Sequence, residues 1–365
     1  MIKILHFVPF GGGAQGGIES FIMNIYRLID RSKLQFDFLT YGDPAFFIDE
    51  ITMLGGKVFC LTSRRDNPIK CYSETKKFFE MYGDTYKFLH MHICSASNIL
   101  PMKLNKTIPY IIIHSHLSAT LGGIATCLHK INQIYILKHA YALWACSDLA
   151  AKHMYGENYE NDERYKFIPN AIDIEKYNFN KDIYINYRRQ LNILEDDIIL
   201  GFVGRLVKVK NVEYLIDIIY RLCKIDSHFK LMIIGDGPSR KDIEKKIKDL
   251  NLERNVLLLG ARNDVDILLQ SMDMFISASY VEGLPVSVIE AQAAGLKCIV
   301  SSEITRQVNI CGMVEFIPRL SGLDVWVNHI LKYKTYNREE HKEEIDCSPF
   351  NIHSLLAILE NYYLQ

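Results

Sequence analysis

The sequence alternates between short runs of apolar, β-branched residues and longer segments with a helical spacing of apolar positions. In the first half the predicted strands are Ile4–Phe10, Phe36–Tyr41, Lys57–Leu61, Phe88–Ile93, Tyr110–His116, Leu143–Cys146 and Lys166–Ile168. The second half continues with Ile198–Val203, Lys230–Ile234, Val256–Leu259, Met274–Ser277 and Cys298–Ser301. Helical patterns such as Ile18–Leu28 and Ser73–Tyr82 separate several of these runs. Strands that alternate with helices form parallel sheets covered on both faces, so an α/β fold is predicted.

The alternation is interrupted near the middle of the chain. Pro169-Asn170-Ala171 and the polar run Tyr177–Arg189 predict a linker near residues 175–195. At about 100–200 residues per domain, a chain of 365 residues has room for two domains. We therefore expect an N-terminal domain over 1–180 and a C-terminal domain over 181–347. The last segment, 348–365, contains the amphipathic pattern Ile352–Tyr362 and is expected to pack back on the N-terminal domain.

Charge and cysteine content exclude several classes of protein. The 42 Lys and Arg residues nearly balance 43 Asp and Glu residues, which argues against a nucleic-acid binder. Nine scattered cysteines without a C-x-x-C favour buried thiols in a reducing cytoplasm over a zinc cluster or disulfides. Met1–Phe10 is followed at once by glycines and is typical of a first strand, not of a signal peptide. Leu117–Leu128 is too short to span a bilayer, so we expect a soluble or peripheral protein.

The segment from Tyr280 to Ala291 follows a predicted strand and opens a predicted helix. Pro285 suits the first helical position, and the Gly283 and Leu284 amides would then lie at the positive helix end. With Glu282 in the loop and Glu290 inside the helix, the carboxylates would be roughly 8–12 Å apart. They would therefore bind different parts of one extended ligand, although two acids near a helix are also common without any function.

Three other loops occupy the same place after a strand. Gly201–Leu206 is followed by Lys208 and Lys210, and Asn211 is the expected N-cap of a helix over Val212–Cys223. An arginine fork and a lysine point charge beside a helix start suit a diphosphate, or they are solvated loop cations. Gly235-Asp236-Gly237-Pro238 and the glycine-rich segment 11–17 either approach phosphates closely or are plain turns.

All four loops are expected at the carboxyl edges of their sheets, where open α/β sheets bind ligands. A cleft between two such domains would hold a nucleotide diphosphate whose outer group faces the first domain. The first domain adds two His-x-His pairs at strand ends, His90-Met91-His92 and His114-Ser115-His116. Each pair lies on one face of its strand. Hydrogen bonding to a sugar or backbone, burial in the core, and a metal site are the three interpretations, and no Cys or acidic ligand accompanies the last.

Taken together, these segments resemble a GT-B glycosyltransferase of the large retaining family 4, which contains glycogen synthase-like and bacterial polysaccharide enzymes. Glu282 and Glu290 match its E-x7-E signature, and Gly204-Arg205-Leu206 with Lys210 matches its G-R-L-x3-K element. Further matches are Ile234–Pro238 and Ile168–Asp173, whereas Asn211 stands where the family often has glycine. The resemblance implies two Rossmann-like domains that face each other across a cleft.

The resemblance also implies roles for individual residues. Arg205 and Lys210 would neutralise the diphosphate of a nucleotide-sugar, Glu290 would bind the ribose, and Glu282 would hold the donor sugar. His116 would line the sugar side of the cleft, and Arg262 belongs to the segment that meets the base. The implied catalytic residues are Glu282, Arg205, Lys210 and His116. The implied nucleotide-sugar-binding residues are Gly16, Gly17, Gly204, Arg205, Lys210, Gly235, Arg262, Glu282, Gly283, Leu284 and Glu290.

The activity implied is a retaining glycosyl transfer from a nucleotide-sugar, with UDP as the expected nucleotide. No metal cofactor is expected, because the cations and amides would replace a divalent ion. The acceptor would be a saccharide or an undecaprenyl-linked saccharide of bacterial capsular or exopolysaccharide synthesis, in the cytoplasm or at the inner face of the plasma membrane. Basic residues of the first domain suit contact with anionic headgroups, or they form a solvated face: Arg64, Arg65, Lys70, Lys76 and Lys77.

Other functions stay open from the residues alone. A non-catalytic subunit with the same fold would bind the donor without turnover. A nicotinamide-dependent oxidoreductase is suggested by the glycine-rich first turn, where Gly11, Gly13 and Gly16 have the G-x-G-x-x-G spacing, but the second predicted strand, Phe36–Tyr41, does not end on an acid that would bind a ribose. A glycosidase using Glu282 and Glu290 would leave the anion-binding loops without a purpose.

Overall fold

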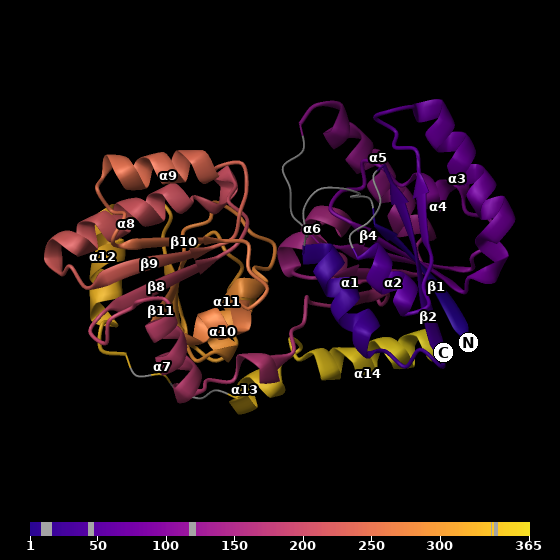
Figure 1. The fold of residues 1–365 in the computed structure, drawn as a ribbon. Helices are drawn as coiled ribbons and strands as arrows, with labels where there is room; N and C mark the ends of the chain where they lie inside the picture. Colours follow the sequence, from indigo (N-terminus) through magenta and orange to yellow (C-terminus); the bar gives the residue numbers. More distant parts are fainter. Residues whose placement is uncertain (9–16, 43–46, 117–121, 337, 339–341) are drawn as a thin grey trace. The chain divides into compact units, whose positions relative to one another are not determined.

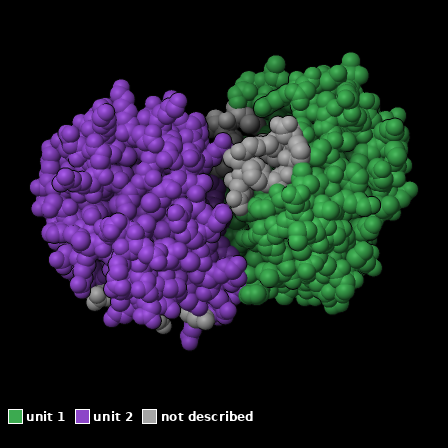
Figure 2. Space-filling model, in the orientation of Figure 1, with its two compact units in different colours: residues 1–171, 352–365 green, residues 172–351 purple. Residues whose placement is uncertain are grey.

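The computed structural model describes residues 1–8, 17–42, 47–116, 122–336, 338 and 342–365. Contacts divide them into two compact units, which Figure 2 colours separately. Unit 1 comprises Met1–Ala171 and Ile352–Gln365, and unit 2 comprises Ile172–Asn351. Each unit is an α/β domain built on its own parallel sheet, as the alternating pattern predicts (Figure 1).

The sheet of unit 1 has seven strands in the order β3-β2-β1-β4-β5-β6-β7, with every neighbouring pair parallel. The strands are β1 (Ile2–Val8), β2 (Leu34–Tyr41), β3 (Val58–Leu61), β4 (Phe88–Ile93), β5 (Tyr110–Ser115), β6 (Ala142–Ala145) and β7 (Tyr165–Phe167). The helices are α1 (Gly17–Leu28), α2 (Ile48–Met53), α3 (Pro68–Tyr82), α4 (Leu100–Leu104), α5 (Ile124–His139), α6 (Asp148–Tyr155) and α14 (Ile352–Leu364).

The C-terminal helix α14 belongs to the core of unit 1 although its sequence follows unit 2. It contacts α1, and its residues Leu355, Leu359 and Tyr363 are buried among those of α1 and the sheet. The backbone N–H of Asp30 also donates to Glu360 on α14 at 2.8 Å. The long return of the chain is therefore stabilised by apolar burial together with a polar contact.

The sheet of unit 2 has six parallel strands in the order β10-β9-β8-β11-β12-β13. The strands are β8 (Ile198–Val203), β9 (Phe229–Ile234), β10 (Val256–Gly260), β11 (Met274–Ser277), β12 (Lys297–Ser301) and β13 (Val314–Ile317). The helices are α7 (Lys181–Gln190), α8 (Val212–Ile225), α9 (Arg240–Asp249), α10 (Val265–Gln270), α11 (Val286–Ala293), α12 (Leu323–Lys332) and α13 (Lys342–Asp346).

The linker predicted near residues 175–195 is wrong over 181–190, because these residues form α7 of unit 2. Its one buried side chain is Arg188, whose guanidinium donates to the carbonyl of Asp197 at 2.5 Å and to the carboxylate of Asp273 at 3.0 Å. A helix anchored by a buried arginine has no apolar stripe, so the sequence pattern did not indicate it. Strand β13 was also not predicted.

Candidate functional site

The strand order of unit 2 reverses between β8 and β11. Counted along the chain, the order is 3-2-1-4-5-6, so the first and fourth strands are neighbours. Connections leave these two strands in opposite directions, which opens a crevice at their carboxyl ends. The loops that follow β8 and β11 contain most of the site residues predicted in this unit.

The loops after β8 and β9 are stacked on each other through their backbones. The N–H of Gly204 donates to Ile234, and the N–H of Leu206 donates to Asp236, at 3.0 and 2.9 Å. A Cβ on Gly235 would lie 2.0 Å from the Gly204 carbonyl oxygen, and Gly235 has a φ of +134°. Only glycine fits this position, so Gly235 holds the Gly204 loop in place.

Lys210 and Glu282 join the loops after β8 and β11. Lys210 ends the short 3₁₀ turn η4 (Lys208–Lys210), and its Nζ lies 2.5 Å from Glu282 Oε2. The other carboxylate oxygen accepts a hydrogen bond from Ser279 at 2.6 Å. Both side chains of the ion pair are largely buried, so their geometry is fixed by neighbours and not by solvent. The sequence analysis did not identify Ser279. A serine three residues before Glu282 is the only feature of the sequence that could have indicated it.

Arg205 differs from Lys210 because it is exposed. Within the described residues, its guanidinium forms no hydrogen bond or ion pair. The Lys210 side chain lies beside Gly204, the residue before Arg205, because a Cβ on Gly204 would be 3.7 Å from Lys210 Cε. One loop of unit 2 therefore presents a paired ammonium and a free guanidinium.

Asn211 follows this loop at the N-cap position of α8, but its side chain does not cap the helix. Its φ is +53°, in the left-handed region that glycine and asparagine adopt with least strain. The side chain donates instead to the Ala278 carbonyl at 3.2 Å and accepts from the Tyr280 hydroxyl at 3.1 Å. Asn211 therefore connects the loop after β8 to the loop after β11, and the prediction that its side chain caps α8 is wrong.

Helix α11 starts beside these groups. Pro285 is its N-cap, one position earlier than predicted, and Gly283 and Leu284 are buried just before it. Glu282 forms an isolated parallel bridge with Ile304, which fixes the loop from the other side. The segment from Glu282 to Leu284 therefore lies at the positive end of α11.

Glu290 lies in the second turn of α11 and is held by a residue that sequence reasoning missed. The Tyr177 hydroxyl donates to Glu290 Oε1 at 2.8 Å, and Tyr177 ends the 3₁₀ turn η3 (Ile174–Tyr177). Burial raises the pKa of Glu290, and the hydrogen bond from Tyr177 opposes that rise. Burial and the adjacent Glu290 raise the pKa of Tyr177, which keeps its proton available for donation. The contact spans 113 positions, so no local pattern indicates it.

Arg262 lies after β10 and is exposed. It forms a two-point ion pair with Asp264, at 2.8 and 2.6 Å. The pair holds the Arg262 side chain along its own loop. That Arg262 belongs to the segment that meets the nucleobase stays a prediction.

The predicted site residues of unit 1 fall on two regions. Gly16 lies outside the described residues, and Gly17 is the first residue of α1. His116 follows β5 and is buried, and its backbone N–H donates to Ile93 at 3.2 Å. Its ring joins His6, His90, His92 and His114 in a cluster beside β1 and β4, where the strand order of this sheet reverses.

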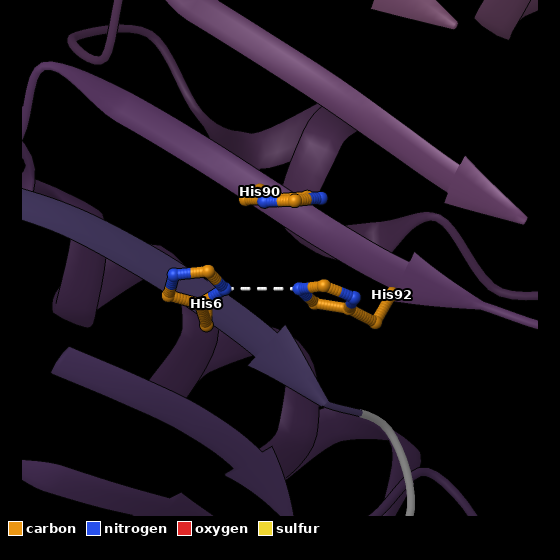
Figure 3. A group of neighbouring side chains, drawn as sticks. All are labelled: His6, His90 and His92. Carbon is orange, nitrogen blue, oxygen red and sulfur yellow. Dashed lines mark hydrogen bonds between the residues drawn. The ribbon is translucent and has the colours of Figure 1, made fainter. Parts of the chain in front are cut away.

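The cluster rings are hydrogen-bonded to one another. His92 bonds both to His6, as drawn in Figure 3, and to His116, each at 2.9 Å. His114 Nε2 donates to the Ile168 carbonyl at 3.0 Å, so its Nδ1 accepts from His90 at 3.3 Å. His90 in turn accepts from the Tyr363 hydroxyl of α14 at 2.6 Å. This bonding matches the interpretation of core histidines.

Burial lowers the pKa of every ring in this cluster, to about 3 for His6 and for His116. The rings are therefore neutral at physiological pH. Ligand nitrogens of His6, His90 and His92 lie within 4.8 Å of one another, as do those of His92, His114 and His116. Both groups consist of histidines alone, and their mutual hydrogen bonds occupy nitrogens that a metal would need. Within the described residues, His6 Nε2 and His116 Nδ1 form no hydrogen bond of ordinary geometry, although the Asn170 side chain lies close enough to the His116 ring to oppose the fall of its pKa.

A family model described as glycosyl transferases group 1 matches residues 184–312, which include every site loop of unit 2. The putative glycosyltransferase EpsF of Bacillus subtilis is 31% identical over 99% of this chain and 96% of its own length. UDP-Gal:alpha-D-GlcNAc-diphosphoundecaprenol alpha-1,3-galactosyltransferase of Escherichia coli is 29% identical over 63% of this chain and 68% of its own.

Solved structures share the fold over the whole chain. HepE from Anabaena, in complex with UDP, superimposes with a TM-score of 0.78 over 99% of both chains at 16% identity. Sucrose-phosphate synthase from Thermosynechococcus elongatus gives 0.77 over 100% of this chain and 98% of its own, also at 16% identity. These likenesses confirm the predicted fold class of two parallel-sheet, Rossmann-like domains.

Proposed function

Because this chain belongs to the group 1 family of glycosyltransferases, we propose that it moves a sugar from a UDP-sugar to a saccharide or lipid-linked saccharide acceptor. The enzyme is a glycosyltransferase of class EC 2.4 with two Rossmann-like domains. The observation that carries the choice of donor is the loop of Arg205 and Lys210 at the strand-order reversal of unit 2. It offers two cations beside the start of α11. A diphosphate is the leaving group that such a site binds.

Transfer of the sugar builds negative charge on the diphosphate and positive charge on the sugar ring. Arg205, exposed and unpaired among the described residues, is free to form a two-point contact with phosphate oxygens. The Lys210 ammonium has three N–H groups, so it can keep Glu282 as a partner and still donate to the diphosphate. Fixed cations stabilise the developing charge without reorganisation, which replaces the role of a metal ion.

The two acids take different parts of the donor in this proposal. Glu282 is fixed by Lys210 and Ser279 and holds hydroxyls of the sugar, beside the amides of Gly283 and Leu284. Glu290 receives one hydrogen bond from Tyr177 on Oε1, and its Oε2 is assigned to the ribose. Tyr177 is thus a positioning residue for the nucleotide.

Stereochemistry and the remaining contacts complete the proposal. We assign retention of configuration, with the acceptor attacking from the leaving-group face and a donor phosphate oxygen taking its proton. His116 is assigned to the sugar side of the donor site. Gly16, Gly17 and Gly204 approach the phosphates, and Gly235 and Arg262 shape the nucleotide end.

Bacterial surface-polysaccharide synthesis is the proposed setting, at the cytoplasmic face of the plasma membrane. The names of two relatives support it: the galactosyltransferase of E. coli, and poly(ribitol-phosphate) alpha-N-acetylglucosaminyltransferase of Staphylococcus aureus. Among the described residues no helix is long and apolar enough to cross a bilayer. Peripheral contact with an anionic membrane is part of this proposal.

Arg205→Ala tests the proposed diphosphate site. Charge-assisted hydrogen bonds contribute about 1.5–3 kcal/mol, so UDP affinity measured by calorimetry should fall about 10- to 100-fold. Stability should not change, since the guanidinium has no partner among the described residues. Arg221→Ala is the matched control, because Arg221 is also exposed in unit 2 and pairs with Asp324. The proposal fails if UDP- and GDP-sugars do not bind, or if Arg205→Ala binds UDP like the control.

A further inference from the structure

Three of the five clustered histidines of unit 1 form a hydrogen-bonded row across the sheet. His92 Nε2 lies 2.9 Å from His6 Nδ1, and His92 Nδ1 lies 2.9 Å from His116 Nε2. We call these three residues the histidine row. Figure 3 shows the first of the two bonds, with the ring of His90 beside it but not joined to it. The row therefore extends from β1 through β4 to the residue that follows β5.

The protons of the histidine row cannot be placed independently of one another. All three rings are neutral because burial lowers their pKa. A neutral imidazole has one N–H and one lone pair, and each bond of the row needs one of each. If His6 donates through Nδ1, His92 accepts at Nε2 and donates from Nδ1, so His116 carries its proton on Nδ1. In the opposite order every proton lies on Nε2. The row therefore has two proton orders.

The groups at the two ends of the row favour one order. In the part of the chain that the structure describes, His6 Nε2 and His116 Nδ1 are buried without a hydrogen bond of ordinary geometry, and so is the acceptor Asn170 Oδ1. The Asn170 side chain lies close enough to the His116 ring to oppose the fall of its pKa. A proton on His116 Nδ1 therefore has an acceptor beside it. A proton on His6 Nε2 would instead be a buried donor without an acceptor, which is costly.

We propose that Asn170 and His92 are positioning residues that hold His116 as a hydrogen-bond donor through Nδ1. His92 occupies the lone pair on His116 Nε2, so this ring does not act as a base. A ligand oxygen that accepts a hydrogen bond can take the place of Asn170 Oδ1 without any proton moving in the row. The inference rests on the proposed function only in naming that ligand, an oxygen of the donor sugar. The proton order itself requires no ligand.

The other two histidines of the cluster have the opposite order. The Tyr363 hydroxyl donates to His90 Nδ1 at 2.6 Å, and His114 Nε2 donates to the Ile168 carbonyl at 3.0 Å. His90 and His114 therefore both carry their protons on Nε2. Two histidines of one strand, His90 and His92, are thus expected to be opposite tautomers. Burial alone does not produce this difference, because both rings are buried.

Nuclear magnetic resonance of the full chain, with isotope-labelled histidine rings, tests the proton order without any ligand. Long-range proton–nitrogen correlations at neutral pH distinguish Nδ1–H rings from Nε2–H rings. His6, His92 and His116 should be Nδ1–H, and His90 and His114 should be Nε2–H. Each preference should be about tenfold or more, because the other order leaves a buried donor unpaired. The inference is wrong if His116 is an Nε2–H ring, or if all five rings share one tautomer.

Two substitutions of Asn170 test the acceptor at the end of the row. Asn170→Asp keeps an acceptor and has no N–H that could face the ring, so His116 should stay in the Nδ1–H form. Asn170→Leu removes the acceptor, so His6, His92 and His116 should lose most of their preference together. The inference is wrong if Asn170→Asp reverses the row, because the native amide would then face His116 with its N–H group. It is also wrong if Asn170→Leu leaves the preference intact.

His92→Leu interrupts the row and separates proton coupling from packing. The His6 tautomer should then no longer respond to Asn170→Leu, whereas it should respond in the parent. His90→Leu is the matched control, because His90 is also buried in β4 but lies outside the row. The control should keep the response of His6, although both leucine variants lose buried hydrogen bonds. Equal responses in the two leucine backgrounds would contradict the coupling.

UDP affinity separates this inference from the proposed function. Calorimetry with UDP should give the parent value for every variant, since Asn170 and the histidines lie in unit 1 and the diphosphate site in unit 2. If UDP and UDP-sugars do not bind the parent, the proposed function fails and the proton order is unaffected. If UDP binds but His116 is an Nε2–H ring, this inference fails and the diphosphate site is unaffected.

Discussion

Gly235→Ala is expected to destabilise unit 2 and leave unit 1 unchanged. The added Cβ would lie 2.0 Å from the Gly204 carbonyl oxygen, and Cβ atoms in proteins essentially never approach closer than 3.0 Å. One of the two loops must therefore move by at least about 1 Å. The movement strains the hydrogen bond between Gly204 and Ile234 and the one between Gly235 and Gly260, at 3.0 and 2.7 Å.

The magnitude follows from two contributions. A residue other than glycine at a φ of +134° costs about 1–3 kcal/mol in backbone strain. Each weakened backbone hydrogen bond costs about 1 kcal/mol more. We expect a loss of about 3–5 kcal/mol, a large share of the stability of a domain. UDP affinity should fall as well, because Arg205 directly follows the displaced Gly204.

The two tryptophans of the chain report the two units separately. Trp144 is buried in unit 1 and Trp326 is buried in unit 2. Urea unfolding followed by fluorescence in Trp144→Phe and Trp326→Phe backgrounds therefore assigns the loss to one unit. Gly322→Ala is the control, because Gly322 has a φ of −65° and a Cβ there meets no atom within 4 Å. The control should change stability by less than about 1 kcal/mol. Equal midpoints for Gly235→Ala and Gly322→Ala would refute the reasoning.

Substitutions at three further positions of unit 2, Tyr177, Asn211 and Arg338, have expected outcomes. Burial raises the pKa of Glu290, so stability falls as pH rises from its usual value near 4.5 toward the folded value. Tyr177→Phe removes the opposing hydrogen bond and should extend this fall to higher pH, measured by thermal unfolding between about pH 4 and pH 8. Asn211→Gly should be more stable than Asn211→Ala by about 1 kcal/mol in urea, because φ is +53°; equal stabilities would contradict the backbone argument. Arg338→Met should lose about 2–4 kcal/mol, because its buried guanidinium donates to the carbonyls of Ala294 and Gln270. The exposed Lys334→Met, measured by the same Trp326 fluorescence, should lose less than about 1 kcal/mol.

The strands were predictable because their apolar runs are continuous. Phe88–Ile93, Ile198–Val203 and Met274–Ser277 have the same bounds in the sequence pattern and in the structure. Each is buried on both faces, which requires apolar residues at nearly every position. Strand β13 escaped prediction because it has only four residues, of which Glu315 is charged and Glu315 and Phe316 are only partly buried.

The sequence pattern of apolar residues does not indicate helices that are held in place by polar side chains. Helix α7 is held by Arg188, and α5 packs through His129, Asn132 and Gln133 while three of its four isoleucines are exposed. Arg188 is the one buried side chain of α7, and two of the three buried side chains of α5, His129 and Asn132, are polar, the third being Ile136. The pattern of apolar residues therefore does not predict α7. For α5 the same pattern would place the exposed isoleucines in the core.

In both units, the role of a residue near a strand end depends on whether it lies inside the strand or beyond its end, which the sequence alone does not determine. In unit 1 the histidines beside the strand-order reversal lie within β1, β4 and β5, except for His116, which follows β5. Side chains inside a buried strand face the helices that cover the sheet, so these rings bond to one another and to Tyr363. In unit 2, Lys210 and Glu282 lie beyond the ends of β8 and β11, on loops that are stacked by backbone contacts. A residue beyond the strand end reaches the crevice, whereas one inside the strand joins the core. His116 stands at that boundary, which is why it alone of the five histidines is assigned a contact with the sugar.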